Sequence, residues 1–316
     1  MENNKIKLVS IVGPTASGKT KLAIELALKF KGEIISADSM QIYKEFNILS
    51  AKPTKSQIQK VNHYLIDILS VKEDFSVAKF TELAHNCIKK VYLKNKLPFV
   101  VGGTGLYVDS LIKDIEFESS CSDSNTPDIM EALKSLSNAE LMEILKKVDP
   151  ESYKKIHINN TKRILRAIQF YHSFGYPISN QVTRSQKTVS RYEVCKIGIS
   201  FKNRQLMYEN IENRVEEMFK SGIVKEVENL RGIKLSKTAA SAIGYKEILN
   251  YLESPQSVSL ESVIESIKKS TRHYAKRQLT WFKRDEEINW IYLDDYKSFS
   301  EVIDCSEQIV KTLYCE

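Results

Sequence analysis

Apolar and polar residues alternate along the first hundred positions in an order that predicts a parallel sheet covered by helices. Short apolar runs at Lys7–Val12, Glu33–Ala37 and Leu97–Val101 have the length and β-branched content of buried strands. Between them, apolar residues recur at helical spacing over Lys19–Phe30 and Ser76–Asn95. Strand, helix, strand, helix, strand is the order of an α/β sheet with helical crossovers.

The pattern changes after residue 115. The stretch FESSCSDSNTPD, residues 117–128, is rich in Ser and Asp and has no apolar period, which is typical of a boundary or an exposed loop. A strand is expected again at SRYEVCKIGIS, residues 190–200, and mainly helix from Phe201 onward. We therefore expect a core of residues 1–115 and 194–316 with a mainly helical insertion, residues 116–193. Three helices are predicted within that insertion: Asp128–Ser137, Ala139–Val148 and Thr161–Ser173.

Composition narrows the class of protein. The chain has 316 residues, of which 42% are hydrophobic, enough for a large core. Its five cysteines are scattered without a CxxC pair, which argues against a zinc site and a disulfide framework and fits a reducing cytoplasm. Neither a signal peptide nor an apolar run of about 20 residues is evident, so no membrane association is expected. The net charge of +7 fits either a lysine-rich composition or a polyanionic partner.

A phosphate-binding loop follows the first strand. GPTASGKT, residues 13–20, matches G-x-x-x-x-G-K-[ST] at every fixed position, and it opens the first helix. Such a loop turns successive backbone N–H groups toward an anion at a helix N-terminus. In this context the fold class expected is a P-loop NTPase-like parallel sheet. Thr20 is the expected Mg²⁺ ligand, and the phosphate-binding residues expected are Gly13, Thr15, Ala16, Ser17, Gly18, Lys19 and Thr20.

The acidic residues around this loop restrict its chemistry. The strand Leu97–Val101 ends in Gly-Gly-Thr-Gly, residues 102–105, without the carboxylate that motor and switch ATPases place there. Asp38 does follow a strand at the edge where ligands bind. It is a candidate general base, although an aspartate in Ala-Asp-Ser also suits an ordinary turn.

Two basic segments suggest an anionic partner. Residues 266–284 contain seven Lys or Arg and no acid, and on a helix Ile267, Tyr274 and Trp281 share one face. In Thr161–Gln169, cationic residues share one side of the helical wheel and apolar residues the other. Such faces suit a phosphodiester backbone, but each also fits an ordinary solvated helix.

Eight motifs in fixed order resemble one family, the tRNA dimethylallyltransferases, also called isopentenyl-diphosphate:tRNA transferases. They span nearly the whole chain: GPTASGKT (13–20), ISADSMQIYK (35–44), AKPT (51–54), HYLIDI (63–68), VVGGTGLYVDSL (100–111), the block from VDP to GYPIS (148–179), SAIGYKE (241–247) and TRHYAKRQLTWFKRD (271–285). P-loops are widespread, but this combination is specific.

The resemblance implies transfer of a dimethylallyl group from its diphosphate to the exocyclic N6 amine of the adenine 3′-adjacent to the anticodon of tRNA. The diphosphate bound by the loop GPTASGKT would then be the leaving group, with Mg²⁺ at Thr20. Asp38 would be the base, Thr104 would lie beside it, and Arg214 would reach the diphosphate. The resemblance also implies a cytoplasmic monomer whose insertion contacts the anticodon stem-loop. The tRNA-binding residues it implies are Asp38, Ser39, Met40, Gln41, Lys162, Arg163, Arg166, Gly244, Tyr245, Lys276, Arg277 and Gln278.

Two alternatives remain open from the residues. One is a small-molecule enzyme on the same core, either an adenylate prenyltransferase or a nucleotide-kinase-like phosphotransferase. The other is an RNA-binding P-loop protein without prenyl chemistry. Neither small-molecule enzyme explains the helical insertion or the basic stretch 266–284.

Overall fold

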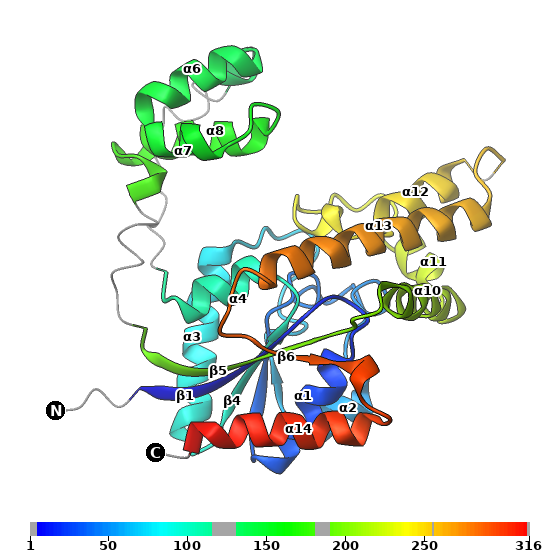
Figure 1. Ribbon diagram of the computed structural model, residues 1–316. Helices are drawn as coiled ribbons and strands as arrows, with labels where there is room; N and C mark the ends of the chain where they lie inside the picture. Colours follow the sequence, from blue (N-terminus) through cyan, green and yellow to red (C-terminus); the bar gives the residue numbers. More distant parts are fainter. Residues whose placement is uncertain (1–4, 116–130, 181–189, 255, 315–316) are drawn as a thin grey trace. The chain divides into compact units, whose positions relative to one another are not determined.

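The core is a six-stranded, all-parallel sheet with the strand order β3-β2-β4-β1-β5-β6. The computed structural model describes residues 5–115, 131–180, 190–254 and 256–314. Strand β1 occupies an inner position, between β4 and β5 (Figure 1). The strands are β1 (Ile6–Val12), β2 (Glu33–Ser36), β3 (His63–Tyr64), β4 (Pro98–Gly102), β5 (Tyr192–Ser200) and β6 (Asn289–Tyr292).

The chain forms two compact units, residues 1–112 with 191–316 and residues 113–190. The insertion expected from the sequence, residues 116–193, differs from the second unit by three residues at each end. The Ser/Asp-rich stretch at 117–128 and the start of the helix expected over Asp128–Ser137 lie outside the described residues.

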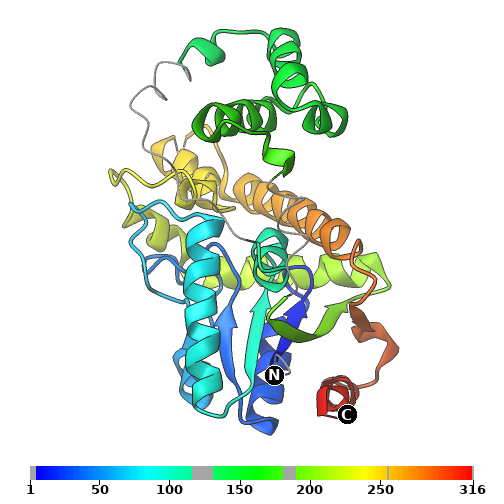
Figure 2. The same cartoon turned by 90° about the vertical axis from the view of Figure 1, so that its left-hand side faces the viewer.

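Helices cover both faces of the sheet because strand residues alternate in direction. Val9 and Ile11 pack on α1 (Lys19–Lys29) and α14 (Phe299–Lys311). Leu8 and Val12 belong to the core on the opposite face, with α3 (Val77–Leu93) and α4 (Gly105–Ile112). Figure 2 shows α3 and α14 on opposite sides of the sheet. The same larger core also receives four later helices: α10 (Arg204–Lys220), α11 (Ile223–Glu228), α12 (Tyr245–Glu253) and α13 (Leu260–Phe282).

The predicted strand–helix rhythm is confirmed, and two strands were missed. Strand β3 has two residues and β6 has four, too short for a period to be recognised. A short helix α2 (Lys55–Lys60) precedes β3, and a capping box at Thr54 fixes its start.

A buried carboxylate ties β2 to the end of α3. Glu33 is 3% exposed, and it accepts hydrogen bonds from Lys96 at 2.7 Å, Tyr64 at 2.7 Å and Lys94 at 3.1 Å. Burial opposes ionisation, but these donors together lower the pKa of Glu33 to about 2. The carboxylate therefore stays charged at neutral pH and secures an edge of the sheet.

The second unit has its own small core. Helices α6 (Asn138–Val148), α7 (Pro150–Lys155) and α8 (Thr161–Phe174) enclose a cluster that includes Leu145 and Ile168, both fully buried. Buried Asp149 caps α7 and also accepts from the N–H of Ser179 at 3.1 Å and its hydroxyl at 2.7 Å. The amphipathic prediction for α8 is confirmed, because Ile164 and Ile168 are buried while the cationic residues on its other side are exposed: Lys162, Arg163 and Arg166.

Candidate active site

The phosphate-binding loop bridges β1 and α1, as its sequence predicts. Gly13 has φ +144°, and a Cβ there would lie 2.2 Å from the carbonyl oxygen of Ile199, so only glycine fits. Gly18 takes a left-handed conformation, φ 83°, and forms the N-cap of α1. The loop is braced internally, since the Ser17 hydroxyl donates to the Pro14 oxygen at 2.8 Å. The N-terminus of α1 lines a cavity through Lys19, Thr20 and Lys21, and its dipole there favours an anion.

A cavity of about 290 Å³ lies directly at this loop. Residues far apart in the sequence line it, and most of the phosphate-binding residues expected from the sequence are among them. The lining comprises Thr15, Ala16, Ser17, Gly18, Lys19, Thr20, Lys21, Asp38, Gln41, Ala51, Lys52, Pro53, Gln57, Gly103, Arg214, Tyr274 and Gln278. The structure thus brings together the P-loop, the candidate base and the candidate arginine.

Two of the basic groups that line the cavity, Lys19 and Arg214, lie close to each other and to Asp38. Withdrawal from bulk water and, to a lesser extent, the nearby Arg214 charge lower the pKa of Lys19, Asp38 opposes both, and the net result is a pKa of about 7. Burial also lowers the pKa of Arg214, with Asp38 again opposing. In this structure the Lys19 ammonium donates to the Pro14 oxygen at 2.5 Å. Two cations held close together with little solvent form a site suited to a polyanion such as a diphosphate.

Asp38 is held by its own turn. Its Oδ1 accepts from the backbone N–H of Met40 at 2.8 Å and of Gln41 at 3.3 Å. Thr104 lies on the other side, where its Oγ1 accepts from the Ser39 N–H at 3.2 Å. Both interpretations of Asp38 are therefore compatible with the geometry: it forms a turn, and it lines the cavity beside Lys19 and Arg214. The turn fixes one carboxylate oxygen, so the group is oriented before any substrate arrives.

Gln41 reinforces this arrangement, since its Oε1 accepts from the Ser36 hydroxyl at 2.9 Å. Ser39, Met40 and Gln41 were expected to hold the base. The N–H groups of Met40 and Gln41 donate to Asp38, whereas that of Ser39 donates to Thr104 in the loop after β4.

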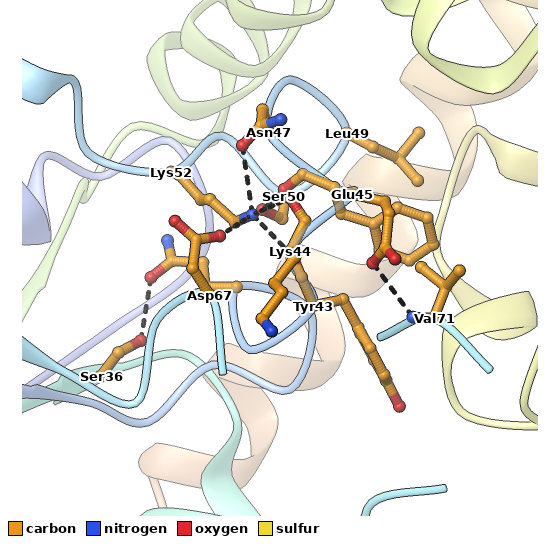
Figure 3. Close-up of polar contacts among 12 residues, drawn as sticks. Ser36, Tyr43, Lys44, Glu45, Asn47, Leu49, Ser50, Lys52, Asp67 and Val71 are labelled. Atoms are coloured by element: carbon orange, nitrogen blue, oxygen red, sulfur yellow. Dashed lines mark hydrogen bonds and ion pairs between the residues drawn. The ribbon is translucent and has the colours of Figure 1, made fainter. Parts of the chain in front are cut away.

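Lys52 is a lining residue that the motif AKPT contains but whose role the sequence did not indicate. Its side chain is 5% exposed. Its ammonium donates to the backbone oxygens of Tyr43 at 2.6 Å and Lys44 at 3.2 Å, to Asn47 Oδ1 at 3.3 Å, and pairs with Asp67 (Figure 3). This buried cation ties together the loop after β2, which forms part of the cavity wall, and joins it to the loop that carries Asp67.

Tyr274 is a second residue whose role the sequence did not indicate. Helical spacing placed it on a face shared with Ile267 and Trp281, and the structure places it in the cavity lining. Burial and the Asp38 charge raise the pKa of Tyr274, hydrogen bonds with Thr104 and Gln278 oppose them, and the net result is a pKa of about 12. The hydroxyl therefore keeps its proton at neutral pH and is a hydrogen-bond donor in the same cavity as Asp38.

The outer side of α13 carries the basic surface predicted from the sequence. His273, Lys276, Arg277, Thr280, Trp281 and Arg284 line a shallow groove there. Lys276 and Arg277 are exposed, and within the described residues neither forms an ion pair. Arg272, by contrast, is paired with Glu212 at 2.6 Å. Trp281 is anchored by its indole N–H, which donates to Asp109 at 3.1 Å.

Three of the residues expected to contact tRNA are buried in the structure. Tyr245 is 7% exposed and packs in the core. Gly244, with φ 97°, forms the N-cap of α12. Gln278 is 5% exposed and faces the P-loop. Their family motifs identified them, but a motif does not state which side of a helix faces solvent.

A phosphate loop at the end of an inner strand, in a parallel sheet covered by helices, defines an α/β protein of the P-loop class. The family model described as IPP transferase matches residues 41–285. The chain belongs to this family.

Individual relatives agree. The chain is 46% identical over 315 residues to a tRNA dimethylallyltransferase of Thermoanaerobacter sp., covering 98% of both chains. A solved tRNA isopentenylpyrophosphate transferase from Bacillus halodurans is 37% identical, with TM-score 0.72 and coverage of 98% of this chain and 96% of that one. A eukaryotic dimethylallyltransferase acting on tRNA has TM-score 0.80 and 26% identity, over 97% of this chain and 80% of that one. The family resemblance noted from the motifs is thereby confirmed.

Proposed function

We propose that this protein transfers a dimethylallyl group from dimethylallyl diphosphate to the N6 amine of the adenine 3′-adjacent to the anticodon of tRNA, releasing diphosphate. The observation that carries the proposal is the cavity that joins the P-loop, two cations and Asp38. An allylic diphosphate needs an anion-binding site for its leaving group, and an amine nucleophile needs a base. This cavity offers groups for both.

In the proposed reaction the C1–O bond of the allylic diphosphate breaks and a bond from C1 to the adenine nitrogen forms. The amine proton passes to an Asp38 oxygen. Lys19, Arg214 and the P-loop amides stabilise the negative charge that grows on the leaving diphosphate. The Tyr274 hydroxyl and Thr104 support the position of the amine and the base.

Magnesium fits the site through oxygen ligands. Thr20 and Asp38 line the same space, and no cluster of three His, Cys, Asp or Glu side chains that could hold a metal occurs within the described residues. Most ligands would then come from the diphosphate and water, as is usual for Mg²⁺. The ion would add positive charge at the leaving group.

The exposed cations of α13 and, separately, those of α8 support a tRNA substrate rather than a free nucleotide. The target adenine must leave its stack to reach a cavity, at a cost of a few kcal/mol that phosphate contacts offset. A cytoplasmic monomer is part of the proposal. Over the described parts of the chain, no helix has the length and apolar character to cross a bilayer.

The test is incubation of the purified protein with unmodified tRNA, dimethylallyl diphosphate and Mg²⁺, followed by mass spectrometry of the digested nucleosides. One dimethylallyl group on adenosine, absent without the diphosphate, is the expected result. Parallel reactions test the small-molecule alternatives. One contains AMP in place of tRNA together with dimethylallyl diphosphate, and the other contains ATP as a phosphate donor. Comparable turnover of either would overturn the proposal, and tRNA binding without modification would favour an RNA-binding role.

A further inference from the structure

A buried amide connects the two loops that hold the substrates. Gln278 lies on α13, four residues after Tyr274, and its side chain points away from the exposed cations Lys276 and Arg277. Its Oε1 accepts from the Thr15 N–H at 2.8 Å, and its Nε2 donates to the Gly103 oxygen at 2.9 Å. One planar group thus satisfies a donor of the P-loop and an acceptor of the loop after β4.

The contact is matched in shape as well as in polarity. A Cβ added to Gly103 would lie 2.1 Å from Nε2, so the absent side chain is what lets the amide reach the backbone. Glutamate at position 278 would place an acceptor against the Gly103 carbonyl, and methionine would supply neither partner. Of these side chains, only glutamine offers both the acceptor and the donor at this reach.

Each loop that the amide joins carries one half of the proposed chemistry. Thr15 belongs to the loop that would hold the diphosphate. Gly103 precedes Thr104, which contacts the Ser39 N–H next to Asp38. A fixed amide between them sets the distance between leaving group and base, which is the quantity that an in-line transfer depends on.

We propose that Gln278 is a positioning residue of the diphosphate site, not a tRNA contact. This rests on the proposed function, with which it shares the cavity. The helix that presents Lys276 and Arg277 outward therefore also completes the active site on its inner side.

Three variants test the inference. Gln278→Met keeps the length and removes both hydrogen bonds. Gly103→Ala keeps the glutamine and displaces its amide. Gln308→Met makes the same chemical change on an exposed position of α14 and is the matched control. For each, steady-state kinetics give kcat and both KM values, calorimetry gives the Kd of pyrophosphate with Mg²⁺, and filter binding gives the Kd of tRNA.

Gln278→Met is expected to weaken pyrophosphate binding about tenfold, as the loss of one to two hydrogen bonds implies, and to lower kcat. The Kd of tRNA should stay within about threefold of wild type, as expected when no phosphate contact is removed. Gly103→Ala should likewise weaken pyrophosphate binding and lower kcat while leaving tRNA binding nearly unchanged. Gln308→Met should change none of these quantities. A fourth single variant, Gln278→Ala, completes a cycle with Gly103→Ala. The double variant should lose less than the sum of these two single losses, because without the amide the added methyl has room.

Weaker tRNA binding with unchanged pyrophosphate binding would overturn the inference and make Gln278 a tRNA contact. Unchanged pyrophosphate binding and kcat in both Gln278→Met and Gly103→Ala would also overturn it, leaving a side chain that only packs. Retained tRNA affinity shows that a variant is folded, and Gly103→Ala decides the matter if Gln278→Met does not fold. Pyrophosphate binding needs no prenyl transfer, so it reports on Gln278 even if wild type proves inactive on tRNA.

Discussion

The lowered pKa of Lys19 predicts that diphosphate binding is linked to proton uptake near neutral pH. The ammonium sits in a partly dry cavity beside Arg214, and its pKa falls from 10.5 to about 7. A diphosphate placed against it supplies the opposite charge and raises that pKa again. At pH 8 the free site holds mostly neutral lysine, so binding should take up about 0.9 proton, and at pH 6 only about 0.1.

The sign follows from these two protonation states. Below pH 7 Lys19 is already charged, so affinity for the anion is at its highest and uptake is small. As pH rises through 7 each binding event must first charge the lysine, and the affinity from this group falls by up to about tenfold per pH unit. Calorimetry with pyrophosphate in buffers of different ionisation enthalpy measures the uptake directly.

Lys19→Arg is the control, because a guanidinium stays charged over the whole range. Protons taken up by pyrophosphate itself are common to both proteins, so the difference between them belongs to Lys19. Equal uptake by wild type and Lys19→Arg at pH 8 would refute this linkage and place the Lys19 pKa near its ordinary value.

Four further substitutions have defined outcomes. Asp38→Asn should lower kcat by about 10² or more while tRNA affinity falls only modestly, measured by single-turnover transfer; full activity would exclude the base role. Lys276→Ala and Arg277→Ala should each reduce the salt-dependence slope of tRNA binding by about one for every phosphate that the cation neutralises, and an unchanged slope would mean a merely solvated face. Glu33→Gln should remove up to about 3 kcal/mol of stability at pH 7. Because the pKa of Glu33 is lowered to about 2, the wild type should lose that advantage as pH falls from about 4.5 to 2. Denaturation of both proteins at pH 7 and at pH 3 measures this. A stability difference between wild type and Glu33→Gln that is the same at both pH values would contradict the prediction.

The sequence predicts the parts of this molecule whose signals are local. The P-loop, the long helices and the central strands each follow from a period or a spacing within about twenty residues. The prediction of the buried and exposed faces of α8 is confirmed for the same reason. Strand β6 is four residues long and is defined by its pairing with β5, so no local sequence pattern predicts it.

The site residues fall into the same two groups, those with a local sequence signal and those defined only by tertiary packing. Asp38 and Lys19 follow strands or loops with a known position in such sheets. Lys52 is an ordinary lysine in the sequence, and only the folded loops supply the backbone oxygens and Asp67 that bury it. For Tyr274 and Gln278 the helical wheel gives the face, whereas the packing of α13 decides what that face touches.

The bond between Thr15 and Gln278 joins residues 263 positions apart in the chain. During synthesis the P-loop emerges from the ribosome long before α13, while the strands around it can already begin to assemble. The phosphate site then still lacks Arg214, Tyr274 and the Gln278 amide. By the proposed function, anion binding therefore requires the nearly finished chain, and a polypeptide released early would carry the P-loop motif without the rest of its site.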